Sequence, residues 1–199
     1  RPCGAPPFPS GEAVLTGVID EKRTGELLGQ VRGLGFEGQI LSLHDLYTLL
    51  DIRSAALIRL SLRLKERRVP GDIAELGVYR GDLAWKLNAL FPDKDLYLFD
   101  TFAGFDERDV AIENKEQLSR ARTGDFQDTS IPLVRSRLPF PEKARFVKGY
   151  FPDTARGYEN LRFALASLDA DLYAPILAGL SFFLPRLSPG GFLLLHDYN

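Results

Sequence analysis

A glycine turn followed about twenty residues later by an acid is the most informative chemical feature of the chain. Residues 72–81 read DIAELGVYRG, an apolar strand that runs into Gly77 and Gly81, and residues 96–104 read LYLFDTFAG, an apolar strand that ends on Asp100. Glycines let a backbone approach a ligand closely, and a helix that follows such a turn presents unpaired amide groups. A carboxylate at the end of the second strand can accept hydrogen bonds from a ribose diol. The pairing predicts a mononucleotide-binding half and a nucleotide-type cofactor.

The spacing inside the turn distinguishes between cofactor classes. Glu75-Leu-Gly77-Val-Tyr79-Arg-Gly81 lacks the G-x-G-x-x-G register that packs a helix against a pyrophosphate, which disfavours NAD. An acid two residues before the first glycine is typical of class I S-adenosylmethionine (SAM) enzymes, whose cofactor has no phosphate and carries an amine for a carboxylate to hold. Plain packing of a strand-to-helix turn explains the motif equally well when it is taken alone.

Ligand-type residues also follow the strands expected at 163–169 and 191–196. Asp169 ends the first of these strands, and His196 and Asp197 end the second. The carboxyl ends of adjacent parallel strands line one crevice, so these three side chains are expected to converge. Clustered carboxylates repel, and a divalent cation relieves that repulsion while it holds a substrate hydroxyl and lowers the pKa of that hydroxyl.

A structural explanation stands beside this one. Asp171 would cap a helix that starts at Leu172, and His196 would only form a hydrogen bond at a strand end. We favour the cap for Asp171 and a functional role for Asp169 and Asp197.

The segments around these residues alternate between strand and helix patterns. Strands are expected at 72–78, 95–101, 144–149, 163–169 and 191–196, and helices at 52–68, 82–90, 130–138, around 153–160 and at 173–186. The alternation predicts an α/β fold, a mostly parallel sheet with helices on both faces. The polar interval 106–128 interrupts it, and we expect a mobile lid there with a solvent-facing helix at 114–122.

Composition limits the class of protein. The 199 residues are 45% hydrophobic and 26% charged, which suits one sizeable core. A net charge of −2 gives no electrostatic footprint for nucleic acid, and no apolar stretch approaches the roughly 20 residues of a membrane span. Cys3 is the only cysteine, and the Pro-rich start lacks the apolar region of a signal peptide, so we expect a cytoplasmic protein.

Residues 1–50 are expected to form an N-terminal appendage. We favour a helical cap on the main domain over a fragment of a preceding α/β element. In that second interpretation a strand, a polar turn over 20–29 and a short helix after Ser42 would suit a nucleotide-sugar or NAD enzyme. His44 is expected to be a polar residue at a helix N-terminus.

Six segments together resemble a known family. In chain order they are VPGDIAELGVYRGD, LYLFDTFAGF, DTSIPLV, RFVKGYFPDT, LDADLY and LSPGGFLLLHDY. They are similar to the macrocin O-methyltransferase family of SAM-dependent, metal-dependent sugar O-methyltransferases, over about residues 69–199. The resemblance implies a Rossmann-like class I methyltransferase fold, and against that fold the sheet is expected to lack the last two strands. We therefore expect a SAM-binding domain over 51–199, with the lid insertion at about 106–128.

The resemblance also implies roles for individual residues. Glu75, Gly77 and Gly81 would line the methionine end of SAM, Asp100 would bind the ribose, Lys148-Gly149-Tyr150 would lie near the adenine, and Tyr79 and Thr101 would complete the cofactor contacts. The metal ligands of the family fall on Asp169, His196 and Asp197.

One departure leaves two versions of the catalytic site open. Where the family usually has Asp-Asp-Tyr, this chain has His196-Asp197-Tyr198. In the first version the site binds a divalent cation, Mg²⁺ or Mn²⁺. Its preference among metals differs from that of the family, because an imidazole ligand favours softer ions than an all-oxygen shell does. In the second there is no metal and His196 is a general base, since an ordinary histidine pKa of about 6.5 suits removal of a hydroxyl proton. Asp169 and His196 are the expected catalytic residues.

The expected function is SAM-dependent O-methyl transfer to a hydroxyl of a small molecule, a sugar or a glycosylated metabolite. Two alternatives stay open: a non-catalytic SAM-fold module of a larger glycan-modifying protein, and a nucleotide-sugar or NAD-binding enzyme. The expected partner is the small-molecule acceptor, with neither nucleic acid nor membrane. A homo-oligomer is also left open.

Overall fold

The computed structural model describes residues 14–16, 21–37, 40–42 and 52–196. The chain divides into two compact units, Arg1–Ala56 and Leu57–Asn199. Several predictions lie outside the described residues, namely those on Cys3, His44, Asp197 and the helix after Ser42.

In the first unit the described residues before residue 52 form a strand, a helix and a second strand. β1 (Val14–Thr16) and β2 (Ile40–Ser42) pair in parallel, and α1 (Glu21–Gly33) lies between them in the chain. The polar stretch 20–29, which is a turn in the second interpretation of this segment, belongs largely to α1, so the turn of that interpretation is wrong. The Glu, Lys, Arg and Leu residues of this stretch are good helix formers and outweigh its two glycines.

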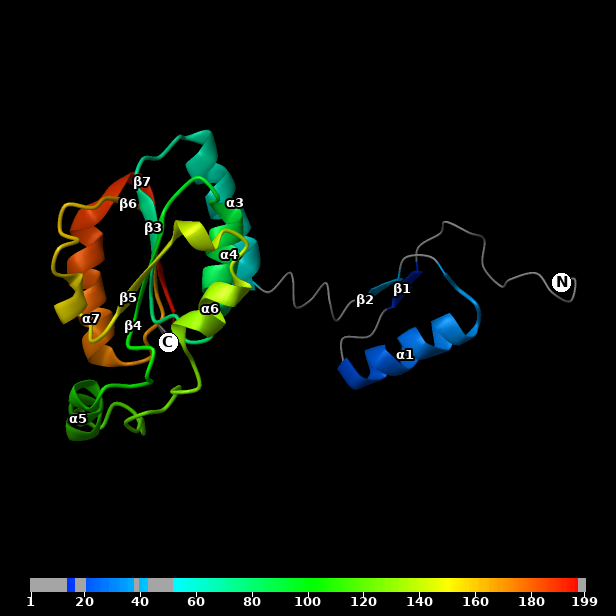
Figure 1. Ribbon diagram of the computed structural model, residues 1–199, viewed down its shortest axis with the longest axis horizontal. Helices are drawn as coiled ribbons and strands as arrows, with labels where there is room; N and C mark the ends of the chain where they lie inside the picture. The colour runs from blue at the N-terminus through cyan, green and yellow to red at the C-terminus, as the bar shows by residue number, and fades with distance from the viewer. Residues whose placement is uncertain (1–13, 17–20, 38–39, 43–51, 197–199) are drawn as a thin grey trace, which may run out of the picture. The chain divides into compact units, whose positions relative to one another are not determined.

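The second unit contains a parallel sheet with the strand order β5-β4-β3-β6-β7 (Figure 1). Its strands are β3 (Asp72–Leu76), β4 (Leu96–Asp100), β5 (Ala144–Lys148), β6 (Phe163–Leu168) and β7 (Leu187–Leu195). Every neighbouring pair is parallel, which confirms the expected α/β fold class. The strand order reverses between β3 and β6, and open α/β sheets bind ligands in the crevice at such a switch point.

β7 begins earlier than we predicted. The strand was expected at 191–196, but Leu187 already pairs with Phe163 before the register shifts. The Pro-Gly-Gly sequence within β7 has the composition of a turn and concealed this pairing. A Cβ at Gly191 would lie 2.9 Å from the carbonyl oxygen of Ala164, so glycine allows the close approach of the two strands.

Helices cover both faces of the sheet (Figure 1). α3 (Ile52–Glu66), α4 (Asp82–Leu90) and α6 (Ile131–Arg137) lie on one face, and α7 (Tyr173–Phe183) lies on the other. The first face buries an aliphatic core that includes Leu57, Leu64, Ile73, Leu83, Leu87, Leu96 and Val134. The second face buries a largely aromatic core that includes Phe99, Phe151, Phe163, Phe182 and Phe183. These two cores hold the carboxyl ends of the strands in place.

Short 3-10 turns replace some of the expected helix. They are η1 (Pro141–Lys143), η2 (Asp153–Ala155) and η3 (Leu184–Arg186). The helix expected around 153–160 is only η2, because Gly157 adopts a positive φ of 93° and the chain turns away there. The helix expected at 173–186 is α7 followed by η3.

The insertion at 106–128 contains a helix, but not where we predicted it. α5 (Glu107–Glu116) replaces the helix expected at 114–122. Asp106 begins it as an N-cap, because its side chain accepts a hydrogen bond from the Arg108 amide, and Gln117 ends it with a φ of 55°. Figure 1 shows α5 beyond the carboxyl ends of the strands, near one end of α7.

The cap predicted for α7 is also wrong. Leu172 is the N-cap of this helix and makes no side-chain cap, while Asp171 lies before it with a φ of 57°. Glu113 of α5 supplies the missing acceptor, since its Oε1 accepts a hydrogen bond from the Tyr173 amide at 2.7 Å. The cap therefore comes from a helix that is distant in the sequence.

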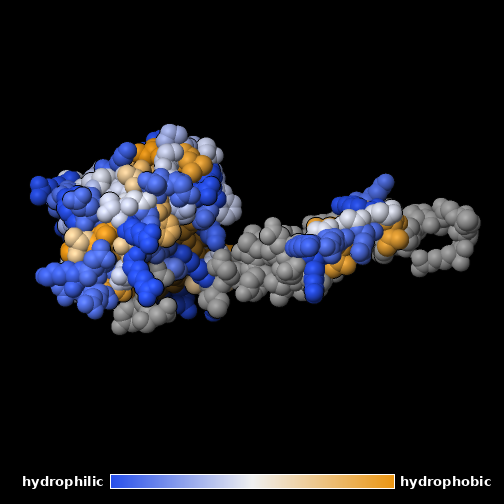
Figure 2. All heavy atoms as spheres, turned by 90° about the horizontal axis from the view of Figure 1, so that it is seen from below, coloured by the Kyte–Doolittle hydropathy of each residue, from blue (hydrophilic) through white to orange (hydrophobic). Residues whose placement is uncertain are grey.

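Hydrophilic side chains alternate with small hydrophobic areas on the face of the second unit shown in Figure 2. None of the described helices combines the length and the apolar character needed to cross a membrane.

Candidate functional site

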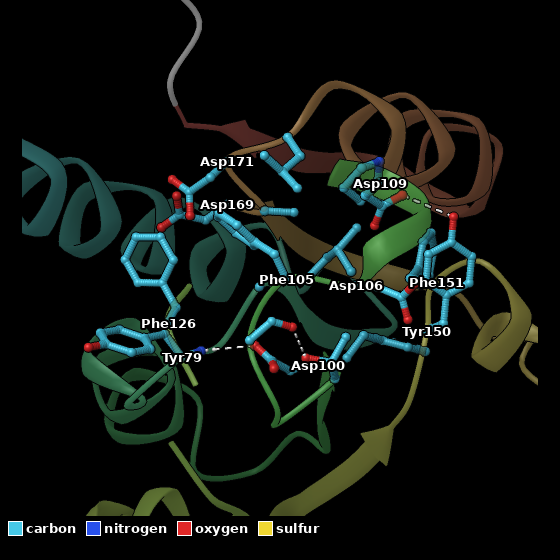
Figure 3. A pocket seen from close by; sticks show the side chains of 18 of the residues that line it. Tyr79, Asp100, Phe105, Asp106, Asp109, Phe126, Tyr150, Phe151, Asp169 and Asp171 are labelled. Carbon is cyan, nitrogen blue, oxygen red and sulfur yellow. Dashed lines mark hydrogen bonds between the residues drawn. The ribbon is translucent and has the colours of Figure 1, made fainter. Parts of the chain in front are cut away.

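A pocket lies at the carboxyl ends of β5, β4, β3 and β6 (Figure 3). Six of the predicted cofactor residues line it: Gly77, Tyr79, Asp100, Thr101, Gly149 and Tyr150. The end of β6 contributes Asp169 and Asp171, and the insertion contributes Asp106, Asp109 and Phe126. The pocket therefore occupies the switch point of the sheet, where α/β folds bind ligands.

Gly77 brings two sides of this pocket together. It adopts a φ of 85°, and a Cβ there would lie 2.0 Å from the carbonyl oxygen of Asp169. The Asp169 amide also donates a hydrogen bond to the Leu76 carbonyl at 2.8 Å. Only glycine allows this approach, so the first turn glycine sets the position of Asp169.

Two of the predicted cofactor residues are not among the residues that line the pocket. Gly81 begins α4 with a φ of 82°, and a Cβ there would lie 2.8 Å from Val134 Cγ1, so this glycine allows α6 to pack closely. Glu75 lies within β3 and is 1% exposed. Because side chains alternate along a strand, Glu75 points to the face opposite that of Leu76, which does line the pocket.

Asp100 fixes the shape of the glycine turn. Its Oδ2 accepts hydrogen bonds from the amides of Val78 at 2.6 Å and Tyr79 at 2.9 Å. Its Oδ1 accepts one from the Phe102 amide at 2.6 Å. The sequence pointed to the residue but not to this role, because a carboxylate that binds a ribose and one that holds a turn have the same sequence pattern. A carboxylate has about four lone-pair sites, so a ribose contact remains compatible with these three bonds.

Asp169 and His196 come together at the carboxyl ends of β6 and β7. Asp169 Oδ1 and His196 Nδ1 are 2.7 Å apart, and the two side chains are 19% and 43% exposed. The His196 amide donates to the Leu168 carbonyl at 2.9 Å, which continues the pairing of the two strands. The structure thus brings together the two residues predicted to be catalytic.

The predicted metal site is not confirmed. Asp197, its third expected ligand, lies outside the described residues. Among the residues that are described, no three His, Cys, Asp or Glu side chains converge closely enough to hold a metal ion. Asp169 and His196 are the two expected ligands that the structure describes, and the metal stays a prediction.

A buried acid and a tyrosine pair on another side of the pocket, and the sequence analysis missed this pair. Asp109 is 6% exposed, and its Oδ1 accepts a hydrogen bond from the Tyr150 hydroxyl at 3.0 Å. Burial raises the pKa of Asp109. Burial and the bond to Asp109 raise the pKa of Tyr150 to about 12.

Arg108 organises the same region. Its guanidinium lies 3.4 Å from the centre of the Tyr150 ring and donates to both oxygens of Asp106, at 2.8 and 2.9 Å. These hydrogen bonds lower the pKa of Asp106. The spacing of Asp106 and Asp109 was the only local signal for this cluster, since Tyr150 follows another strand.

The insertion is attached to the glycine turn by aromatic and polar contacts. The Phe126 ring meets the rings of Tyr79 and Phe105, with centroids 5.1 Å apart in both cases. The Tyr79 hydroxyl donates to Asp128 Oδ1 at 2.7 Å, and the Thr129 hydroxyl donates to the Tyr79 carbonyl. The insertion therefore forms one wall of the pocket, as Figure 3 shows for Phe126.

Residues 52–199 match the family described as Macrocin-O-methyltransferase (TylF). The chain belongs to this family. The match confirms the resemblance of the six sequence segments, and it covers every strand of the five-stranded sheet.

Curated relatives of the chain include O-methyltransferases of Streptomyces and Micromonospora. The 8-demethyl-8-(2,3-dimethoxy-alpha-L-rhamnosyl)-tetracenomycin-C 4'-O-methyltransferase of Streptomyces olivaceus is 32% identical over an alignment of 143 residues, and the match covers 65% of this chain and 54% of that protein. The mycinamicin III 3''-O-methyltransferase of Micromonospora griseorubida is 29% identical over an alignment of 142 residues, and the match covers 65% of this chain and 56% of that protein. The chain spans about half the length of the curated relatives that it matches.

Solved structures agree with the family. The O-methyltransferase NovP superposes with a TM-score of 0.60 at 26% identity, over 73% of this chain and 64% of that chain. The calicheamicin methyltransferase CalS11 superposes with a TM-score of 0.58 at 23% identity, over 88% of this chain and 71% of that chain, and supports the fold. The sheet described above is therefore the Rossmann-like sheet of a methyltransferase.

Proposed function

We propose that residues 51–199 form the SAM-binding domain of an O-methyltransferase that acts on a hydroxyl of a small glycosylated molecule, with the insertion at 106–128 as part of its pocket. One observation carries the proposal: in a chain of this family, Asp169 lines the pocket at the switch point and contacts His196. The names of two relatives support the substrate class, since one specifies a rhamnosyl compound and both specify transfer to oxygen.

The residues that line the pocket support SAM as the cofactor. Gly77 and Tyr79 would hold the methionine end, Asp100 and Thr101 the ribose, and Gly149 and Tyr150 the adenine. At Gly149 the φ is 136° and a Cβ would lie 2.8 Å from Thr154 Cγ2, so the turn after β5 needs a glycine to keep its shape beside the pocket. When bound, SAM supplies an electrophilic methyl group on a cationic sulfur.

Asp169 and His196 would act on the acceptor. If the Nδ1 proton of His196 is shared with Asp169, its Nε2 carries a lone pair that can take the proton of the acceptor hydroxyl. The carboxylate orients the ring and stabilises the imidazolium that results, as in other pairs of a base and an orienting acid. These roles of Asp169 and His196 require no metal. Asp197 would be the added ligand if a cation is required.

Calorimetry on the whole purified protein tests the cofactor, with S-adenosylhomocysteine as the probe and NAD as the control ligand. Selective binding of the probe supports the proposal, and preference for NAD overturns it in favour of a nucleotide-sugar or NAD enzyme. Methyl transfer to a panel of glycosylated acceptors then tests the activity. Binding without turnover would instead indicate a non-catalytic module. Cytoplasmic location and a homo-oligomer stay predictions.

A further inference from the structure

One carboxyl in the pocket wall has no part in the proposed reaction. Asp109 projects from α5 into the pocket, and Figure 3 shows it with Tyr150 on the side away from Asp169 and Asp171. It is 6% exposed, although carboxylates are rarely buried without a specific partner. A buried acid at a pocket wall is therefore a candidate for ligand recognition.

The hydrogen bonds around Asp109 define what it can accept. The Tyr150 hydroxyl occupies Oδ1, so Oδ2 is the oxygen that the carboxyl presents to a ligand in the pocket. The nearby cation does not compete for it, because the Arg108 guanidinium is held by Asp106 and lies over the Tyr150 ring. Asp109 thus suits a ligand group that donates a hydrogen bond.

The two ends of the proposed cofactor can be assigned to sides of the pocket. The reacting methyl group must lie near Asp169 and His196, which hold the acceptor. Asp100, the expected ribose ligand, lies between that side and the side of Asp109 (Figure 3). The purine must then extend toward Asp109 and Tyr150, where the rings of Tyr150 and Phe151 form part of the wall.

We infer that Asp109 accepts a hydrogen bond from the exocyclic 6-amino group of the cofactor's purine and so selects a 6-aminopurine over a 6-oxopurine. This inference rests on the proposed function. An amino group donates to the carboxylate, whereas a 6-oxo group places a second acceptor against it and leaves a buried polar group without its partner. Tyr150 and Arg108 are positioning residues that hold the carboxyl in this orientation.

Calorimetric titration of two probes into the whole protein tests the inference. The probes are S-adenosylhomocysteine and its 6-oxo analogue S-inosylhomocysteine. The wild type is expected to bind the adenosyl probe roughly 10- to 100-fold more tightly. In Asp109→Asn the ratio of the two dissociation constants should fall toward one, because the amide of Asn can donate a hydrogen bond to a 6-oxo group. Asp153→Asn is the matched control, since Asp153 also pairs with Arg108 at 3.3 Å but does not line the pocket.

The outcomes separate this inference from the proposed function. Equal binding of both probes by the wild type, or an unchanged ratio in a folded Asp109→Asn protein, overturns the role of Asp109 and leaves the SAM proposal standing. Failure of the folded wild type to bind either probe overturns both. A ratio that falls in Asp109→Asn and persists in Asp153→Asn supports the inference.

Discussion

Glu113 caps α7 from another helix: its Oε1 accepts a hydrogen bond from the Tyr173 amide at 2.7 Å, and the side chain of Glu113 is 2% exposed. The contact joins α5 of the insertion to the helix that follows Asp169 and Asp171. It links the wall of the pocket near Asp109 to the segment that carries Asp169, one of the two proposed acceptor residues.

Removal of this contact should loosen both elements. We expect Glu113→Ala to lower the free energy of unfolding by about 1–2 kcal/mol, because it removes the cap of α7 and the acceptor of the Tyr173 amide. Urea denaturation measures this change. Glu116→Ala, on the exposed side of the same helix, is the control and should change stability far less. Equal effects of the two variants would contradict the capping role.

The contrast between α5 and the sheet shows what the sequence could predict. β3, β4 and β6 are buried apolar runs bounded by Gly, Pro or Asp, so the pattern alone located them within one or two residues. The buried face of α5 includes Asp109 and Glu113, whose partners lie 41 and 60 residues further along the chain. No local pattern reveals such partners, and a helix with buried acids looks solvated in sequence.

In the candidate site, too, the sequence predicted some features and not others. The residue types at Gly77, Asp100 and Asp169 were predicted, because strand ends of a parallel sheet share one edge. That Asp100 holds the turn through three amides, and that Gly81 serves the packing of α6, depends on side-chain directions that spacing does not specify.

Gly77→Ala should destabilise the fold much more than Gly157→Ala, although both glycines have a positive φ. A Cβ at Gly77 meets the Asp169 carbonyl at 2.0 Å, whereas one at Gly157, with a φ of 93°, meets nothing within 4 Å. We expect Gly157→Ala to cost about 1–2 kcal/mol from backbone strain alone. Gly77→Ala should cost roughly 2–5 kcal/mol, because overpacking adds to that strain. Chemical denaturation compares them, and equal losses would show that the close approach to Asp169 is unimportant.

Asp100→Asn should weaken cofactor binding through the glycine turn. The amide group of Asn cannot accept the hydrogen bonds of Val78, Tyr79 and Phe102 together, because half of its polar surface is a donor. We expect the Kd for S-adenosylhomocysteine to rise at least about tenfold, with a loss of about 1–3 kcal/mol in stability. Asp93→Asn, an exposed acid before β4, is the control. Unchanged affinity would remove Asp100 from the cofactor site.

The Tyr150 phenol should ionise at a higher pH than an ordinary tyrosine. Its folded pKa of about 12 lies above the ordinary value of about 10, mainly because of burial and then because of Asp109. The stability that the neutral phenol contributes is therefore fully present below pH 10 and is lost as the pH rises toward about 12. The ultraviolet absorbance of ionised tyrosine, compared between wild type and Tyr150→Phe, measures this step. Asp109→Asn should move it to lower pH, and a step already complete near pH 10 would contradict the buried pair.

His196 provides the sharpest test of the acceptor chemistry. His196→Gln keeps a polar side chain of similar size but removes the base, so we expect kcat to fall about 100-fold or more. The Kd for S-adenosylhomocysteine should stay within about twofold, because His196 is not among the residues that line the pocket. Turnover by the wild type should persist in excess chelator. If chelator abolishes turnover and Mn²⁺ restores it, Asp197 completes a metal site and His196 is its ligand rather than the base.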